Sequence, residues 1–239
     1  MNDARIQAHR MSPQQERLWL LQQKDLSGYG QIAVLIEGPL DHGRLEEAVA
    51  GLVRRHEILR TTFRHQPGLK VPLQVVAGSS TPVLQVIDLT RSNSSETALE
   101  IDQLLQSERQ VSFDYAKGPL ARFAIVKLTA HRHILTASVS ALCTDAWSLN
   151  NLARQLAELY ESGAQSEDES DDNVQYAAYA SWQIELLEGD EAEAGRTFWK
   201  KQNLLSLPPV HLPYERKTGV LGSSATASVT SALDRRKVC

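Results

Sequence analysis

The sequence predicts an α/β domain in which a mixed β-sheet packs against helices. Residues 31–37, 121–128 and 134–142 are apolar and rich in β-branched or small side chains, as is typical of buried strands. In residues 41–53 and 149–160, apolar side chains recur at the three- and four-residue spacing of a helix. Strands and helices do not alternate strictly, which favours a mixed sheet over an all-parallel one.

The first half of the chain begins with a helix over residues 12–22, because Ser12 can cap it and Pro13 suits its first position. Asp41 can cap the helix that follows the strand at residues 31–37. We expect the remaining elements of this half to be strands around and after the turn at Pro67-Gly68, over residues 60–64, 73–76 and 83–89.

The second half carries more helical periodicity than strand pattern. We expect helices over residues 96–109, 176–187 and 191–204, the first with an imperfect apolar face. Residues 167–172 (EDESDD) form an acidic run, which we interpret as a solvated linker. Residues 225–233 alternate weakly and predict the start of another strand.

The composition excludes several classes of protein. The chain has 239 residues, 42% hydrophobic content and a net charge of -4, without a Lys/Arg cluster, so we expect no nucleic-acid partner. No apolar run approaches the ~20 residues of a membrane span, and the polar first ten residues lack a signal-peptide core. Cys143 and Cys239 lie far apart, which argues against a disulfide framework. We therefore expect a cytoplasmic protein without a membrane association.

Four separated motifs carry a resemblance to a known family. They read SPQQERLW at residues 12–19, RHEILRTTF at residues 55–63, FD…GPL-A-R between residues 113 and 122, and YAAYASWQ at residues 176–183. In this order and spacing they resemble the condensation domains of nonribosomal peptide synthetases. One departure is Ala178, which stands where the family usually has Asp.

The resemblance implies a chloramphenicol acetyltransferase-like fold: two similar lobes, each a sheet packed on helices, with a tunnel between them. Such a domain needs about twice this length. We therefore expect a flexible N-terminus at residues 1–9, a condensation-like N-terminal lobe at residues 10–174, and crossover helices with a truncated start of the second lobe at residues 175–239. The chain ends just after a strand-like segment, which we interpret as truncation.

The family's catalytic motif, His-His-x-x-x-Asp-Gly, aligns with Ser140-Ala-Leu-Cys-Thr-Asp145-Ala146. Ser140 and Ala141 thus occupy the two histidine positions, and Ala146 replaces the glycine. In the family, the second histidine orients or deprotonates the amine that attacks a thioester on a carrier protein's phosphopantetheine arm. A positioned base contributes ~10²–10⁴-fold to such a rate, and an alanine supplies none. A serine hydroxyl would need a base of its own.

Asp145 remains although the histidines are replaced, and Trp147-Ser148 after it supports the alignment. The resemblance implies a structural ion pair between Asp145 and Arg60, the second arginine of the RHEILRTTF motif. The alternative is a simple helix cap by Asp145 or Ser148. Of the two, we expect the ion pair.

Other side chains with chemical potential have plainer interpretations. Cys143 is expected to be a small buried hydrophobe rather than a nucleophile. His131 and His133 could begin a metal site, but no third ligand is evident, and we expect a solvated strand start. His56 is expected to pack or cap a helix end. We expect three tryptophans to be core anchors rather than substrate platforms: Trp19, Trp182 and Trp199.

These features lead to three hypotheses of function. The favoured one is a catalytically degenerate condensation-like domain that binds a peptidyl or aminoacyl carrier protein, or a tailoring enzyme. The alternative is an active acyltransferase that forms amide or ester bonds by substrate-assisted deprotonation. The third is a decayed or truncated gene product without independent function. In each case we expect no directly bound cofactor or metal, substrates on a partner's phosphopantetheine, and an apolar face that packs on the second lobe and other synthetase domains.

Overall fold

The computed structural model describes residues 7–22, 28–91, 94–110, 112–163, 174–202 and 204–208. Of residues 94, 95, 109, 110 and 205 it describes the backbone alone. Several predictions fall outside these residues: the flexible N-terminus at residues 1–6, the acidic linker at residues 167–172, the strand at residues 225–233, and the start of the second lobe beyond residue 208.

The main sheet has four strands in the order β2-β7-β6-β5. They are β2 (Tyr29–Glu37), β5 (Leu84–Asp88), β6 (Ala121–Thr129) and β7 (Arg132–Ser140). β7 is antiparallel to both of its neighbours, whereas β5 and β6 are parallel. The predicted mixed sheet is therefore confirmed. The strand predicted to reach residue 142 ends at residue 140, where the backbone leaves the sheet in a turn.

A second, antiparallel sheet has the order β1-β4-β3, with β1 (Gln7–His9), β3 (Thr61–Arg64) and β4 (Leu73–Val76). Residues 7–9, which we expected in a flexible N-terminus, instead pair with the free edge of β4, and this expectation is corrected. The strand predicted from residue 60 begins one residue later, because Arg60 ends a short 3₁₀ helix, Glu57–Arg60.

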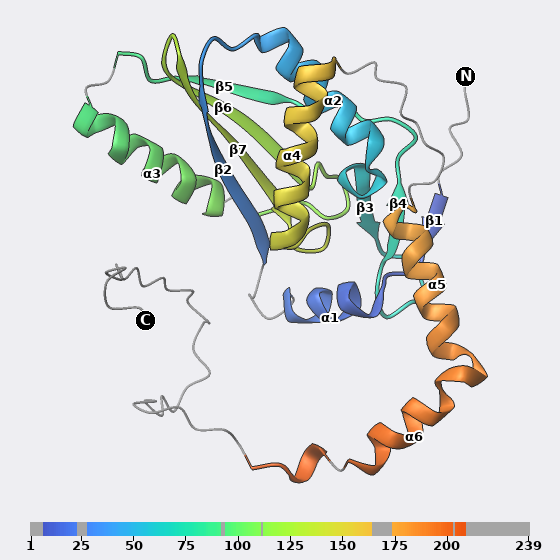
Figure 1. The fold of residues 1–239 in the computed structure, drawn as a ribbon. Coiled ribbons are helices and arrows are strands. Elements are labelled where there is room, and N and C mark those ends of the chain that lie inside the picture. Colours follow the sequence, from blue (N-terminus) through green and yellow to red (C-terminus); the bar gives the residue numbers. More distant parts are fainter. Residues whose placement is uncertain are drawn as a thin grey trace, which may run out of the picture.

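Helices cover both faces of the main sheet. α2 (His42–Arg55) and α4 (Ala146–Ser162) lie side by side on one face, and α3 (Ser94–Gln110) lies on the other (Figure 1). Asp41 caps α2 as predicted, because its Oδ1 accepts a hydrogen bond of 3.1 Å from the Arg44 backbone N–H. The core lies between the main sheet and the α2–α4 layer and includes Leu45, Val49, Leu52, Ile125, Val139, Leu149 and Leu156.

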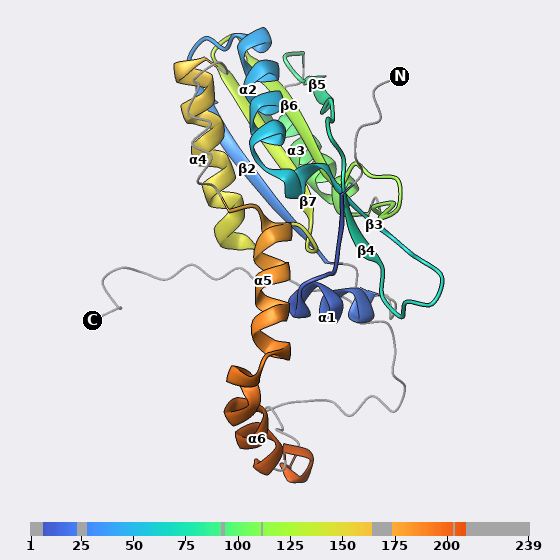
Figure 2. The same ribbon diagram turned by 90° about the vertical axis from the view of Figure 1, so that its right-hand side faces the viewer.

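The remaining helices stand at one end of this α/β body. α1 (Pro13–Gln22) lies beneath it, and α5 (Tyr176–Glu188) and α6 (Glu193–Lys201) extend away from it (Figure 2). The helix predicted at residues 191–204 is shortened to α6, because Asp190–Ala192 before it and Leu204–Ser206 after it form 3₁₀ turns. Within the described part of the chain, every helix is too short or too polar to cross a membrane.

Candidate functional site

The aligned motif lies on a cavity of about 680 Å³, which we call the motif cavity. Its walls are α1, the turn after β7, the start of α4 and the start of α5. This size falls in the range of small-molecule sites. Its polar and motif residues include Gln15, His56, Ala141, Asp145, Gln155, Gln175, Tyr176 and Tyr179.

A buried hydrogen-bond network holds the turn after β7 against α1. The Gln15 side-chain amide donates to the Leu142 carbonyl oxygen (2.9 Å) and to Oε1 of Gln74 (3.2 Å). In return, the Ser12 backbone N–H donates to Oε1 of Gln15 (3.0 Å), and Gln74 donates to the carbonyl oxygen of Arg10 (2.8 Å). Ser12, Gln15 and Gln74 are buried, so this satisfied network fixes the geometry of the turn. The sequence analysis did not predict this network. The three-residue spacing of Ser12 and Gln15 in the first motif was its signal, because that spacing allows each to bond the other's backbone N–H.

The two residues at the histidine positions point in different directions. Ser140 is fully buried and does not line the motif cavity. Its hydroxyl oxygen accepts a hydrogen bond from the Leu142 backbone N–H (3.2 Å). Ala141 does line the cavity, and its methyl group leaves so little room that a Cβ at Gly28 would lie 3.0 Å from it. Of the two histidine positions, only that of Ala141 therefore lines the motif cavity.

Asp145 caps α4. Its Oδ1 accepts from the Ser148 backbone N–H at 2.7 Å, and it is exposed on the rim of the motif cavity. Hydrogen bonds from the Ser148 side chain and backbone hold the pKa of Asp145 below its ordinary value. Ala146 and Trp147 follow in the first helical turn, and Trp147 is 79% exposed.

The expected ion pair between Arg60 and Asp145 is wrong. Arg60 instead donates to the carbonyl oxygen of Ala77 and lies 3.5 Å from Oε1 of Glu57, and it lines a different cavity from Asp145. The physical reason is local: the 3₁₀ turn aims Arg60 at the end of β4, and the helix start already satisfies Asp145. The alternative interpretation of Asp145 as a cap is confirmed.

Of the remaining predictions, the one for Cys143 is confirmed and the one for His133 is wrong. Cys143 is buried in the core, as predicted, and burial raises the pKa of its thiol well above the ordinary value. His133, expected at a solvated strand start, is 2% exposed, because β7 turns it toward α2. Its ring centroid lies 6.1 Å from that of His42. Among the described residues, no group of three or more His, Cys, Asp or Glu side chains could hold a metal ion.

An aromatic ladder runs outward from the motif cavity along α5. The Tyr176 hydroxyl lies 2.8 Å from that of Ser12, and burial raises the pKa of Tyr176. The ring of Tyr179 follows at 5.9 Å and that of Trp182 at a further 5.8 Å. Trp182 is 56% exposed and Trp199 on α6 is 62% exposed, so neither is the core anchor that we expected.

Trp19 does anchor the body. Its ring packs edge-on against Tyr115 at 5.5 Å and His65 at 5.7 Å, and it is partly buried against the core. One motif tryptophan, Trp19, is therefore packed against the core and another, Trp182, is exposed. The sequence does not distinguish them, because residue type and spacing do not reveal which surface a helix packs against.

His56 lines the motif cavity, a role that the sequence analysis did not assign. It caps the end of α2, as predicted, and its Nε2 lies 2.5 Å from Oε1 of Gln155 on α4. Nearby, Gln175 accepts from the Glu57 backbone N–H (3.0 Å) and donates to the Arg55 carbonyl oxygen (3.1 Å). The second motif thus positions the start of α5 at the cavity.

In chemical terms, the motif cavity can bind and orient a polar ligand. Its side chains offer amides, hydroxyls and the ionised Asp145. The one imidazole among its lining residues, His56, is held by Gln155. A neutral general base at the motif position itself is lacking, because Ala141 stands there.

Comparisons with known proteins identify the family. The family model described as Condensation domain matches residues 6–237. Among curated proteins, the chain is 30% identical over 230 residues to chondramide synthase cmdD of Chondromyces crocatus, a match that covers 94% of this chain and 6% of that protein. It is 32% identical over 204 residues to tyrocidine synthase 3 of Brevibacillus parabrevis, covering 84% and 3% respectively. The chain thus spans a small fraction of each of these relatives.

Solved structures agree on the fold. The X-domain in a complex with OxyB from teicoplanin biosynthesis superposes with a TM-score of 0.74 at 24% identity, over 88% of this chain and 46% of that one. The X-domain alone gives 0.68 at 25% identity, over 80% and 42%. The predicted chloramphenicol acetyltransferase-like fold class is confirmed by these condensation-type neighbours. The chain belongs to the condensation-domain family of nonribosomal peptide synthetases.

Proposed function

We propose that this chain is a catalytically degenerate condensation domain that binds a carrier protein or a tailoring enzyme instead of forming amide bonds. The observation that carries the proposal is Ala141, which faces the motif cavity where the family resemblance places a catalytic imidazole. Removing a general base costs about 10²–10⁴-fold in rate. Ser140 cannot compensate, because its hydroxyl is buried outside the cavity.

Retained binding is supported by the parts of the site that the chain keeps. The Gln15 network, the cap at Asp145 and the contacts of Gln175 are all in place, so the cavity keeps its shape without the base. A motif cavity that keeps its shape but lacks the catalytic base favours binding of a partner over amide formation.

The partner class follows from the same residues. The natural partner is a peptidyl or aminoacyl carrier protein whose phosphopantetheine presents the substrate, in the cytoplasm, together with other synthetase domains. A tailoring enzyme is the second partner that we propose. The X-domain with a similar fold forms a complex with OxyB, and the exposed aromatic side chains of α5 and α6 offer this chain a surface for such a contact.

The test combines binding and turnover. We would titrate the chain with carrier protein in its apo and aminoacyl-phosphopantetheinyl forms, and measure binding by calorimetry. In parallel, donor- and acceptor-loaded carrier proteins would be incubated with the chain and a supplied second lobe, and dipeptidyl species detected by intact mass. We expect binding in the first assay and no dipeptide in the second. Dipeptide formation at ordinary enzyme rates would overturn the proposal.

A second candidate is an active acyltransferase, and one observation favours it: His56 lines the same cavity as Ala141. If the unmodified chain does turn over, His56→Gln should abolish the activity while leaving carrier binding intact. The matched comparison is His65→Gln, which removes an imidazole outside the lining of the motif cavity. Equal activity of both variants would leave no role for His56 as a base.

A further inference from the structure

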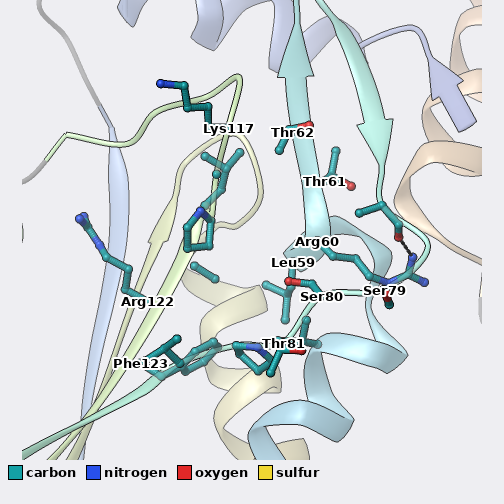
Figure 3. A pocket seen from close by; sticks show the side chains of 18 of the residues that line it. Leu59, Arg60, Thr61, Thr62, Ser79, Ser80, Thr81, Lys117, Arg122 and Phe123 are labelled. Carbon is teal, nitrogen blue, oxygen red and sulfur yellow. Dashed lines mark hydrogen bonds between the residues drawn. The ribbon is translucent and has the colours of Figure 1, made fainter. Parts of the chain in front are cut away.

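A second cavity, of about 780 Å³, lies between the two sheets and shares no lining residue with the motif cavity. We call it the inter-sheet cavity. It is enclosed by β3, the end of β4, the connection at residues 77–83 that crosses to the main sheet, and the start of β6 (Figure 3). Neither the family resemblance nor the motif chemistry assigns it a role.

The charges around this cavity differ in sign from the chain as a whole. Among the described residues, four cationic side chains and one carboxylate, Glu108, line it, while the whole chain carries a net charge of -4. The four are Arg60, Arg64, Lys117 and Arg122. A local excess of positive charge on an acidic protein attracts anions.

Two of these cations stand on β3 and the turn before it. Arg60 is 14% exposed and is held in place by the carbonyl oxygen of Ala77, with Glu57 at 3.5 Å. That carboxylate is farther away than the 2.7–2.9 Å typical of a tight charge-assisted hydrogen bond. Arg64 is exposed, and within the described part of the chain it forms no ion pair. Both guanidinium groups therefore have capacity for a further acceptor.

The other two cations are Lys117, in the segment before β6, and Arg122, the second residue of β6. The Arg122 guanidinium stacks on the ring of Phe113 at 4.2 Å, which fixes its position, and lies 3.6 Å from Glu108. Lys117 lies 3.6 Å from Asp114 and is largely exposed. These contacts are also longer than tight charge-assisted hydrogen bonds.

Three consecutive hydroxyl residues line the cavity beside Arg60. Ser79, Ser80 and Thr81 lie with Arg60 on one side, and Lys117 and Arg122 lie on the other (Figure 3). Hydroxyls donate to carboxylate and phosphate oxygens and accept from water when no ligand is bound. Arg60 with this row of donors can bind an anionic head group, and the cations on the other side of the rim add to the positive potential there.

The floor of the cavity is apolar. It is formed by buried side chains from both sheets and the helix layer: Val53, Leu59, Val75, Val76, Leu120 and Phe123. An inorganic anion would not use this surface, whereas the apolar part of an organic molecule would gain about 25 cal/mol for each Å² that it buries.

We propose that the inter-sheet cavity binds a small amphipathic anion, with a carboxylate or phosphate head at the cationic rim and an apolar body on the floor. This site is independent of the motif cavity and of the function proposed above. It gives the chain a place to bind a small acid directly, without a carrier protein.

The experiment measures binding of four probes to the whole chain by calorimetry, below the micelle concentration: octyl phosphate, octanoate, octanol and inorganic phosphate. We expect one-to-one binding of at least one octyl anion, about tenfold or more tighter than octanol and inorganic phosphate, and weaker at high salt. The tighter of the two anions identifies the head group. Octanol binding as tightly as both anions would overturn the proposal.

Variants locate the site. Arg64→Gln with Lys117→Gln removes two exposed cations of the rim, and should weaken binding of the octyl anion about tenfold without changing the thermal unfolding midpoint. The matched control is Arg132→Gln, which removes an exposed cation outside the cavity lining. Because α5 also exposes apolar rings, Trp182→Ser is the second control and should leave binding unchanged. Binding that survives the rim variant, or that is lost in Trp182→Ser, would overturn the assignment.

Discussion

The side-chain amide of Gln15 on α1 donates a 2.9 Å hydrogen bond to the carbonyl oxygen of Leu142, which lies in the turn carrying the motif. Because Gln15 is buried, Gln15→Ala would leave this carbonyl oxygen and Oε1 of Gln74 without their shared donor. An unsatisfied buried group costs about 1–3 kcal/mol. We expect the free energy of unfolding in urea to fall by that amount, and carrier binding at the motif cavity to weaken.

The neighbouring residue provides the control for this first prediction. Gln14 also lines the motif cavity but is exposed, so Gln14→Ala should change stability by less than about 0.5 kcal/mol. Equal destabilisation by the two variants would show that the network does not hold the turn.

The cap at Asp145 gives a second prediction. Asp145→Ala removes the acceptor for the Ser148 N–H and should cost about 0.5–2 kcal/mol of unfolding free energy, while Asp145→Asn should cost less. Because Arg60 does not pair with Asp145, the variants Arg60→Ala and Asp145→Ala should be additive within about 0.5 kcal/mol in a double-mutant cycle. A larger coupling energy would show that Arg60 and Asp145 do interact, as the ion pair requires.

His133 predicts the pH dependence of stability. Burial, with smaller contributions from His42, Lys127 and His131, lowers the pKa of His133 below its ordinary value of 6.5. The folded state therefore binds fewer protons than the unfolded state in the window just below pH 6.5. Stability should be fully present above that pH and fall as the pH drops through the window.

Urea unfolding between pH 5 and 8 measures this slope. His133→Leu should flatten it, whatever its effect on stability at neutral pH. The matched variant His131→Leu removes an exposed histidine two residues away, which is the smallest of the causes that lower the pKa of His133, and should change the slope much less than His133→Leu does. A slope that is unchanged in His133→Leu would assign the titration to another group.

The exposed rings of α5 and α6 predict self-association of the chain. Trp182 and Trp199 are more than half exposed on helices that extend from the body (Figure 1), and apolar patches of this kind favour association. We expect concentration-dependent sedimentation and binding of a hydrophobic dye. Trp182→Ser with Trp199→Ser should reduce both.

Trp147→Ser is the matched control for these rings. Trp147 is more exposed than Trp182 and Trp199, but it stands at the start of α4 rather than on the extended helices. Its replacement should leave sedimentation and dye binding nearly unchanged. A monodisperse monomer at high concentration, without dye binding, would contradict the prediction.

Much of the fold could be predicted from short segments of the sequence. Capping residues such as Asp41, the periodicity of α2 and α4, and the apolar runs of β2, β6 and β7 are encoded within short segments, and these elements lie where the sequence predicted them. The motifs identified the family, and the alignment placed Ser140 and Ala141 at the histidine positions. A residue type is a property of the sequence, so the missing imidazole needs no structure to be seen.

Contacts between distant segments could not be predicted from the sequence in this way. That Ser140 turns into the core while Ala141 faces the cavity depends on how the end of β7 leaves the sheet. That Arg60 bonds Ala77 rather than Asp145 depends on the path of a 3₁₀ turn. The inter-sheet cavity joins side chains from segments as far apart as Arg60 and Arg122. Such relationships arise from long-range packing, to which local periodicity contributes no information, and only the tertiary structure decided them.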